Sequence, residues 1–363
     1  MSTNYFGQNS LPSEIKVRAS CIRQLPSHCV LQPLIDAPVR AQEGDVLLFE
    51  VLHDSGSVAT VEDQNGRDVS LYHGDLFLGV LGNRRSGTSE YGIIPNDLVI
   101  TSKTQLDLLS VGGVVGIGQN VPDFRHTRQF LKVRPVAFIQ SQGDIVNTIK
   151  LYFRAPPCPV SIAPTIFVGG TSAEVGKTTT CINLIQSLSR AGLKVGAVKL
   201  TGTGRLRDSF AMKDAGALNI ADFPSNGLPT TYTGTNIVVD TAAYLLHSAS
   251  YGADLVIAEL GGDLLEANVP EILQDSRIRS APIAFVQVVA DIIGAIGSLV
   301  ILEEVSLSEN IHIALPKGKN HLASRERLLG RGLHGFDSLS RKECDAVCKV
   351  IIDGLGVNHG LFQ

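Results

Sequence analysis

The segment Phe167–Leu188, which reads FVGGTSAEVGKTTTCINLIQSL, combines the residue types that hold phosphate. An apolar run leads into a loop framed by Gly170 and Gly176, and helical spacing starts at Lys177. Main-chain N–H groups in such a loop and at the start of a helix have no partner of their own and attract anions. Gly176 admits phosphate oxygens close to the main chain, Lys177 adds positive charge, and the hydroxyl of Thr178 suits Mg²⁺. The segment therefore predicts a P-loop.

The spacing of this loop is one residue longer than the common P-loop form. Five residues separate Gly170 from Gly176, where the common form has four. The loop also lacks the early lysine that marks partitioning and transport ATPases. We expect the phosphates to contact residues of the loop and of the first helical turn, namely Gly170, Thr171, Val175, Gly176, Lys177, Thr178 and Thr179.

A second apolar run, VGAVKLTGTGR, places Lys199 at its end. A lysine at the carboxyl end of a parallel strand lies at the ligand-binding edge of the sheet, and a buried ammonium without a partner is costly. We therefore expect Lys199 to face the phosphates rather than to be a solvated lysine. Substrate contacts are expected from Thr201, Thr203 and Arg205. Arg205 and its neighbour Arg207 would bind a carboxylate or phosphate, with solvated loop charges as the alternative.

A third apolar run, ADLVIAELGGDLLE, ends in an acidic residue, Glu259. A carboxylate at this end of a strand is suited to bind Mg²⁺ or its water. Gly261 and Gly262 follow directly and permit a substrate or a second stretch of main chain to approach closely. A third acidic ligand is expected between the second and third strands from one of three aspartates, of which we prefer the first: Asp208, Asp214 and Asp222.

The pattern of apolar residues differs between the two halves of the chain. Residues 165–363 alternate apolar runs with helical segments, which predicts an α/β fold with a P-loop parallel sheet and helices on both faces. Residues 21–154 carry short apolar runs separated by turn residues such as Asn65–Gly66, which predicts a smaller N-terminal β-rich barrel or sandwich. Residues 155–164 hold four prolines and are expected to form a linker. Residues 1–20 are expected to be a loose arm.

The composition limits the classes of partner. The formal net charge is −4 over 363 residues, which argues against nucleic acid as the main partner. No apolar run reaches the length of a membrane span, and the N-terminal residues lack the apolar core of a secretory signal. The six cysteines form no C-x-x-C pair, so a zinc ribbon is not supported. We expect a cytoplasmic protein that acts on a small-molecule substrate, with no nucleic acid or membrane partner, and the sequence leaves a homodimer open.

The loop sequence GTSAEVGKT resembles the dethiobiotin synthetase loop GTDTEVGKT. Seven of nine positions agree, and the departures are Ser172 and Ala173. The resemblance implies ATP and Mg²⁺ as cofactors. It also implies an ATP-dependent ligase that activates a carboxylate of a small amino-acid-like metabolite as a mixed phosphate anhydride and then closes an amide-type bond. Glu174 occupies the place of that family's loop glutamate, near the substrate and the metal.

The later runs resemble the same family more loosely, and VIAELGG is similar to its strand VVEGAGG. Carried over to this chain, the resemblance implies that Lys177 and Lys199 neutralise the transferred phosphoryl group. It implies in the same way that Thr178 and Glu259 hold Mg²⁺. The synthetases consist of a single domain, so the β-rich domain of this chain has no counterpart among them and leaves the acceptor substrate undefined.

Two other families give alternatives. The order of VKLTGTG, ADF and VIAELGG is similar to that in D-glutamate N-acetyltransferases, which would use the P-loop to hold the phosphates of acetyl-CoA. Such an acyltransferase would need no metal at Thr178 or Glu259. The texture also resembles the molybdopterin-guanine-dinucleotide adaptor group, which implies a GTPase or ATPase adaptor for a cofactor or protein partner.

Some polar residues outside these runs are candidates with an open role. In the β-rich domain, Arg84 and Arg85 would reach an anionic substrate or phosphates, with a solvated loop as the alternative. Recognition of the nucleotide base would come from the segment that holds Lys317 and Asn320, or from Asp291.

Overall fold

The computed structural model describes residues 14–26, 28–34, 38–121, 129–307, 309–315 and 321–354. Contacts divide the chain into two compact units. The first unit comprises the described residues of Met1–Phe153 together with two later segments, Thr203–Arg207 and Phe223–Thr233. The second unit comprises the rest, so the chain passes between the units several times rather than once.

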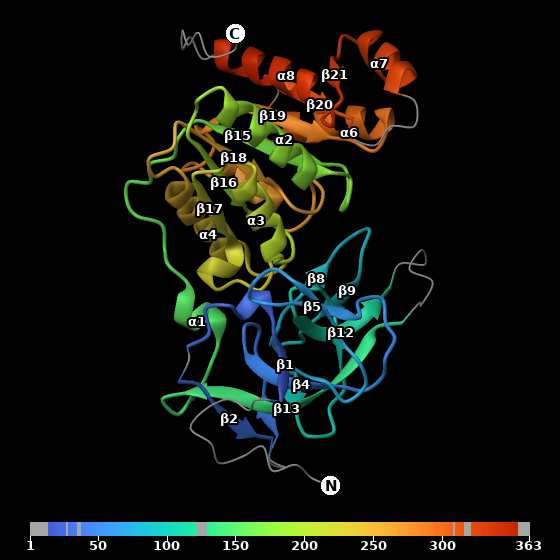
Figure 1. Cartoon of the computed structure of the whole chain (residues 1–363), viewed down its shortest axis with the longest axis vertical. Helices are drawn as coiled ribbons and strands as arrows, with labels where there is room; N and C mark the ends of the chain where they lie inside the picture. The colour runs from blue at the N-terminus through green and yellow to red at the C-terminus, as the bar shows by residue number, and fades with distance from the viewer. Residues whose placement is uncertain are drawn as a thin grey trace. The chain divides into compact units, whose positions relative to one another are not determined.

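The first unit is built mainly from short strands, drawn in blue to green in Figure 1. Its strands are β1 (Ile15–Arg18), β2 (Val30–Pro33), β3 (Val39–Arg40), β4 (Val46–Val51), β5 (Thr60–Glu62), β6 (Asp68–Ser70), β7 (Leu76–Leu81), β8 (Arg84–Arg85), β9 (Tyr91–Ile93), β10 (Val99–Ile100), β11 (Leu106–Leu108), β12 (Val114–Asn120), β13 (Leu131–Ser141) and β14 (Asp144–Ile145). Its helical elements are η1 (Ser20–Ile22), α1 (Thr148–Tyr152) and η3 (Phe223–Asn226).

Five of these strands close into a ring, which makes the predicted β-rich domain a small barrel. β4 pairs with β7 and β13, β13 pairs with β11, and β11 pairs with β12. The ring closes because β12 pairs with β7 through Val114 opposite Val80 and Val115 opposite Leu81. Apolar side chains from the inward positions fill the barrel, and the rings of Phe49 and Phe77 stack with centroids 5.4 Å apart.

The predicted hairpin at Asn65–Gly66 is confirmed, with a different turn geometry. β5 and β6 pair antiparallel, and Gly66 has a positive φ of 80°. Asn65 does not share that conformation, because the side chain of Asp63 organises the turn by accepting hydrogen bonds from the N–H groups of Asn65 and Arg67.

The prediction of a loose arm over residues 1–20 is wrong for the part that the structure describes. β1, at Ile15–Arg18, pairs parallel with β7, and Val17 is buried in the barrel core. The alternation of apolar and polar residues in IKVR is too short to stand out from a coil in the sequence.

The second unit contains seven strands and the long helices. Its strands are β15 (Thr165–Gly170), β16 (Val195–Lys199), β17 (Asn219–Asp222), β18 (Leu255–Glu259), β19 (Pro282–Val288), β20 (Ile311–Ala314) and β21 (Gly335–Phe336). Its helices are α2 (Lys177–Arg190), α3 (Leu206–Asp214), α4 (Thr235–Ala249), α5 (Val269–Gln274), α6 (Ile292–Glu304), α7 (His321–Leu329) and α8 (Arg341–Gly354). The first two residues of α3 belong to the first unit.

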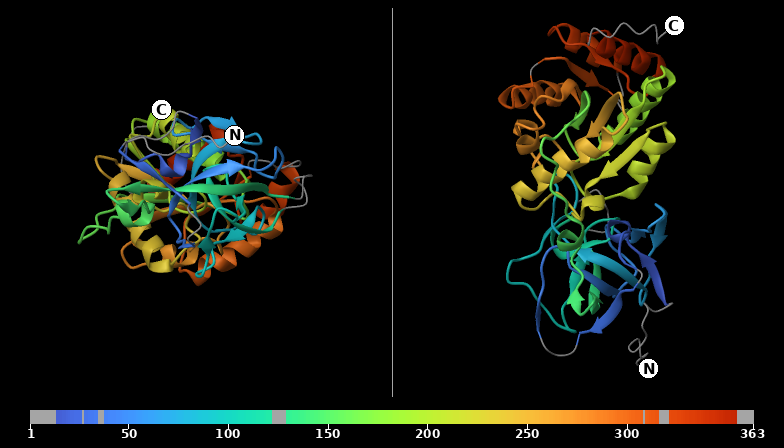
Figure 2. Two further views of the ribbon diagram at one scale, coloured as in Figure 1. Left: turned by 90° about the horizontal axis from the view of Figure 1, so that it is seen from below. Right: turned by 90° about the vertical axis from the view of Figure 1, so that its left-hand side faces the viewer.

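All strand pairs of this sheet are parallel, in the order β17-β16-β18-β15-β19-β20-β21. Right-handed crossovers place the helix between β15 and β16 and the helix between β17 and β18 on opposite faces, because these steps run in opposite directions. α2 accordingly packs on α8, whereas α4 packs on α5, and Figure 2 shows helices on both sides of the strands. The predicted α/β fold is confirmed.

The central strands of the sheet are buried on both faces, as the continuous apolar runs predict. The sequence prediction placed β15, α2, β16 and β18 correctly but did not identify β17 and α4. Among the residues that the structure describes, no helix combines the length and apolar character needed to cross a bilayer.

Candidate functional site

The loop between β15 and α2 has the geometry of a phosphate-binding turn. Gly176 caps the helix with a positive φ of 110°, a conformation that favours glycine. A Cβ atom at Gly170 would lie 2.8 Å from side-chain atoms of both Lys177 and Val175. A larger residue at position 170 would therefore require the side chains of Lys177 and Val175 to shift.

Lys177 lies inside this loop rather than on the surface. Its Nζ donates hydrogen bonds to the carbonyl oxygens of Ser172, at 2.7 Å, and Gly262, at 2.6 Å. Burial lowers the pKa of Lys177, and the charge of Lys199 adds to this, while Glu259 works in the opposite direction. The ammonium is thus fixed between the loop and the segment after β18, with neutral carbonyl groups as its hydrogen-bond acceptors.

Glu259 ends β18 beside the start of α2. Its Oε1 accepts a hydrogen bond of 3.0 Å from the hydroxyl of Thr178. Its Oε2 is buried and has no hydrogen-bond partner among the described residues. Burial raises the pKa of Glu259, and the charges of Lys199 and Lys177 oppose that shift. An unpartnered carboxylate oxygen beside a hydroxyl is a donor set that suits Mg²⁺, which prefers oxygen ligands.

A row of charged residues crosses the carboxyl ends of three neighbouring strands. The register places Lys199 of β16 opposite Glu259 of β18 and opposite Asp222 of β17. The ammonium of Lys199 also forms an ion pair with Asp208 of α3. Burial lowers the pKa of Lys199, but Asp208 and Glu259 outweigh burial and raise it above its ordinary value. Lys199 is therefore a buried lysine that keeps its positive charge.

The segments after β16 and β18 touch each other at this edge. The hydroxyl of Thr201 donates a 2.9 Å hydrogen bond to the carbonyl of Gly261, and a Cβ at Gly261 would lie 2.3 Å from the carbonyl oxygen of Thr201. Gly262 has a positive φ of 85° and turns its carbonyl onto Lys177. The two glycines thus serve this close packing of main chain.

Two of the predicted substrate residues are not part of this cluster. Thr203 and Arg205 belong to the first unit, where Thr203 forms an isolated bridge with Thr230. The guanidinium of Arg205 pairs with Asp68 at 3.0 Å and lies 3.9 Å from Glu62. Its charge therefore pairs with carboxylates of the barrel, and substrate binding by Arg205 stays a prediction.

Glu174 lies in the loop with a positive φ of 60° and an exposed side chain. Of the aspartates considered as a third acidic ligand, Asp208 and Asp222 flank Lys199, whereas Asp214 is exposed at the end of α3. Within the described ranges, no group of three His, Cys, Asp or Glu residues has the geometry to hold a metal ion. The predicted set of Thr178, Glu259 and Asp208 contains only two such residues, so Asp208 as a metal ligand stays a prediction.

The remaining candidates have other roles or lie elsewhere. Arg84 forms a 2.9 Å ion pair with the fully buried Glu90, which contradicts a role in binding an outside anion. Asp291 caps α6 by accepting a 2.7 Å hydrogen bond from the N–H of Gly294. Lys317 and Asn320 lie outside the described residues.

Sequence reasoning missed two groups that shape the site. The carbonyls of Ser172 and Gly262 accept hydrogen bonds from Lys177. Every residue has a main-chain carbonyl, so the sequence does not show which of them act as acceptors. Asp222 was considered only as a metal ligand. Its place at the end of an apolar run beside β16 could have been found had NIAD been identified as a strand.

Comparison with known proteins places the second unit in a broad class. Residues 166–319 match the family CbiA, described as the CobQ/CobB/MinD/ParA nucleotide binding domain. No curated protein matches the sequence. This segment is therefore a nucleotide-binding domain of the P-loop NTPase class. The match does not single out the dethiobiotin synthetases.

Several solved structures are similar over about half of the chain. They include the cell division protein FtsY from Thermotoga maritima, at 18% identity over 56% of this chain and 74% of that chain, with a TM-score of 0.36. A DUF1611 family protein from Anabaena variabilis has 13% identity over 55% of this chain and 63% of that chain, with a TM-score of 0.37. A nucleotide-binding protein in complex with ADP from Archaeoglobus fulgidus has 14% identity over 52% and 87%, with a TM-score of 0.34.

Proposed function

We propose that the second unit binds ATP with Mg²⁺ and transfers the γ-phosphoryl group to a carboxylate of a small amino-acid-like metabolite, which then forms an amide-type bond. The observation that carries this proposal is Lys199. It is a second buried ammonium near Lys177, at the carboxyl end of β16, and its charge is maintained by Asp208 and Glu259. Positive groups placed around the moving phosphoryl group stabilise the charge of the transition state, so a second buried lysine beside the P-loop lysine favours phosphoryl transfer.

The reaction divides into two balanced steps. A carboxylate oxygen of the substrate attacks the γ-phosphorus, the bond from that phosphorus to the bridging oxygen breaks, and ADP leaves. An amine then attacks the carbonyl carbon of the acyl phosphate, loses a proton to solvent and displaces phosphate. Lys177 and Lys199 would neutralise charge on the phosphoryl oxygens, and the loop N–H groups would orient the nucleotide.

Thr178 and Glu259 would hold Mg²⁺, which when bound lowers the negative charge of the phosphates. The orphaned Oε2 of Glu259 and the neighbouring hydroxyl fit this role. The same pair distinguishes the proposal from the acetyl-CoA alternative, because an acyltransferase that only grips phosphates needs no metal ligand at the end of β18.

Calorimetric titration with ATP, GTP and acetyl-CoA, each with and without Mg²⁺, tests nucleotide choice. We expect ATP binding that requires Mg²⁺ and is lost in Lys177→Ala. Binding of acetyl-CoA without Mg²⁺ and no binding of ATP would overturn the proposal in favour of acyl transfer. A preference for GTP would overturn it in favour of an adaptor.

Trapping of the acyl phosphate tests the chemistry. The protein is incubated with ATP, Mg²⁺, the proteinogenic amino acids and hydroxylamine, and hydroxamate formation is measured together with ADP release. We expect hydroxamate with at least one amino acid, and a loss of about 10²–10³ in rate in Lys199→Ala. Lys194→Ala is the matched control, because this exposed lysine precedes the opposite end of β16. ADP release without hydroxamate would contradict carboxylate activation.

A further inference from the structure

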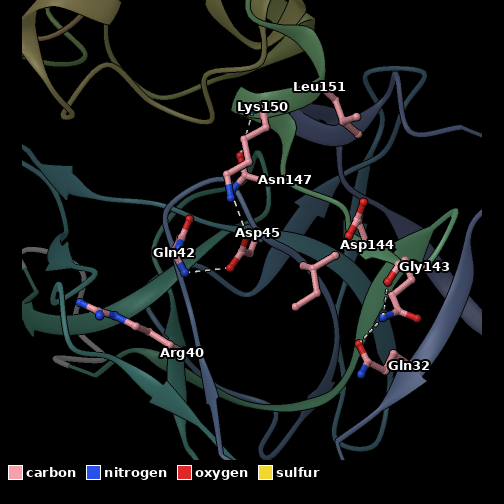
Figure 3. A pocket seen from close by; sticks show the side chains of 11 residues that line it. Gln32, Arg40, Gln42, Asp45, Gly143, Asp144, Asn147, Lys150 and Leu151 are labelled. Atoms are coloured by element: carbon pink, nitrogen blue, oxygen red, sulfur yellow. Dashed lines mark hydrogen bonds between the residues drawn. The ribbon is translucent and has the colours of Figure 1, made fainter.

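The first unit contains an open hollow that takes no part in the nucleotide site. Its volume is about 550 Å³, and it is lined by β2, β3, the loop before β4, the hairpin of β13 and β14, and α1. This volume is within the range of small-molecule sites, roughly 300–1,000 Å³. Most such sites are lined by apolar side chains, whereas charged and amide side chains dominate here, as Figure 3 shows.

One wall of the hollow is rigid because its polar groups satisfy one another. The buried carboxylate of Asp45 accepts hydrogen bonds of 2.8 Å from the N–H of Gln42 and from Nδ2 of Asn147. Asn147 also donates to the carbonyl of Glu43 and accepts from the N–H of Lys150, at the start of α1. Asp45 and Asn147 therefore position their neighbours and have little capacity left for a ligand.

Two opposite charges on the same lining are left open. Lys150 projects from α1 with an exposed side chain, and its ammonium has no hydrogen bond or ion pair within the described part of the chain. Asp144 lies on β14, and its carboxylate likewise has no side-chain partner in the described ranges. Lys150 interacts electrostatically with Asp45, but the oxygens of Asp45 already accept two hydrogen bonds.

Amide groups complete the lining between these charges. Nε2 of Gln140 donates a 2.6 Å hydrogen bond to Oε1 of Gln32, so the amide nitrogen of Gln32 and the amide oxygen of Gln140 are left to face a ligand. The side-chain amide of Gln42 has no partner among the described residues. A further cation of the lining, Arg40, donates two hydrogen bonds to the carbonyl of Asn96. The hollow thus offers hydrogen-bond donors and acceptors, together with one ammonium and one carboxylate that have no hydrogen-bond partner in the described part of the chain.

We propose that this hollow binds a small zwitterion of the amino-acid class, with its carboxylate on Lys150 and its ammonium on Asp144. A simple anion would leave Asp144 unpaired and repelled, and a simple cation would do the same to Lys150. The amide groups suit the remaining polar atoms of such a ligand. The site goes beyond the proposed phosphoryl transfer and does not depend on it, because none of its residues belongs to the nucleotide-binding unit.

Binding is tested on the full chain without nucleotide. Each proteinogenic L-amino acid is screened by thermal shift, and those that raise Tm are titrated by calorimetry. We expect at least one to bind with Kd on the order of millimolar or below. Lys150→Ala and Asp144→Ala should each weaken that binding by about tenfold or more, because each removes a charge-assisted hydrogen bond. The exposed Lys103 and Asp353, changed to alanine, are the matched controls and should bind as the unaltered chain does.

Ligand analogues separate a zwitterion site from a simpler one. The 2-hydroxy acid that corresponds to the best amino acid lacks the ammonium, and the corresponding amine lacks the carboxylate. Both should bind at least about tenfold more weakly than the amino acid. Equal binding of the hydroxy acid, equal binding in the two site variants, or no binding by any amino acid would each overturn the proposal. ATP titration of the same preparations shows whether the nucleotide site is functional, so loss of amino-acid binding can be distinguished from loss of nucleotide binding.

Discussion

Arg84 in the barrel and Lys177 in the nucleotide-binding unit are largely buried cations with different hydrogen-bond acceptors. In the barrel, Arg84 pairs with the carboxylate of Glu90, and it also donates to the hydroxyl of Ser89 and the carbonyl of Leu109. In the nucleotide-binding unit, Lys177 donates only to two neutral carbonyls among the described residues. The carboxylate of Glu90 neutralises the first cation, whereas the hydrogen-bond acceptors of the second carry no charge. Burial alone therefore does not distinguish these two cations, whereas the charge of the acceptor does. Lys199 is a third case, because it is buried and pairs with Asp208 at the edge of the sheet where Lys177 lies.

The largest expected effect concerns the neutralised cation. Arg84→Ala should lower the free energy of unfolding by about 3–5 kcal/mol, because it leaves the fully buried Glu90 without its cation. Arg85→Ala is the matched control, since the neighbouring arginine is exposed, and it should change stability by no more than about 0.5 kcal/mol. Urea denaturation of both variants measures the difference. Equal values would mean that Arg84 is as dispensable as a surface charge.

Replacement of Lys177 should affect activity more than stability. We expect Lys177→Ala to reduce nucleotide turnover by about 10²–10³ while it destabilises the chain less than Arg84→Ala does. No carboxylate is left unpaired by this change, because the hydrogen-bond acceptors of Lys177 are carbonyls. ADP release measures the loss of turnover, and urea denaturation of the same preparation measures the change in stability. A variant that loses stability as Arg84→Ala does, yet still turns over nucleotide, would reverse the comparison.

The barrel also contains a carboxylate, Glu43, that has no cation as a hydrogen-bond partner among the described residues. Oε1 of Glu43 is buried without a hydrogen-bond partner, although Oε2 accepts from Thr233 and Asn83. Burial raises the pKa of Glu43 from 4.5 to about 7, against these hydrogen bonds and the charge of Arg85. The folded chain therefore holds this proton more tightly than the unfolded chain does.

That proton makes stability depend on pH in a defined direction. The contribution of Glu43 is fully present below about pH 4.5, where both states are protonated, and is lost as the pH rises through about 7, by up to about 3 kcal/mol. Urea midpoints at pH 5 and pH 8 should differ accordingly in the unaltered chain, and the Glu43 share of that difference should vanish in Glu43→Gln. Glu14→Gln, at an exposed position, should retain it. A slope that survives in Glu43→Gln would assign the titration elsewhere.

The smallest effect is expected at the proposed metal ligand. Thr178→Val removes the hydroxyl that contacts Glu259, and we expect Mg²⁺-dependent ATP affinity to fall by about tenfold. Thr178→Ser retains a hydroxyl and should stay near the unaltered value. Calorimetric titration at several Mg²⁺ concentrations distinguishes the two. If the valine variant binds ATP with unchanged Mg²⁺ dependence, the hydroxyl has no part in holding the metal.

The cluster around the P-loop was predictable because its members end parallel strands. Gly170, Gly176 and Lys177 carry a local pattern, and the carboxyl ends of parallel strands meet at one edge whatever lies between them. Lys199 and Glu259 follow from the same rule once their apolar runs are identified as strands. The structure places these two residues opposite each other in register.

Thr203 and Arg205 could not be placed by this reasoning. They follow β16 directly in sequence, but the chain leaves the nucleotide-binding unit at Thr203 and returns at Asp208. Residue types near a strand end do not show to which core the next loop belongs, because that is decided by tertiary contacts. Glu62 provides such contacts, since its buried carboxylate accepts the N–H groups of Leu206 and Arg207.

The same interleaving affects how the protein is made. Domains generally fold as units in the order in which they leave the ribosome, yet the barrel includes segments that extend to Thr233. Until those segments are synthesised, Glu62 lacks its N–H donors, and Cys21 lacks the carbonyls of Gly204 and Pro229 that its thiol contacts. The five strands of the ring lie before β15 in the chain and can pair first. The first unit as a whole is completed only after β15, α2, β16 and β17 have been synthesised.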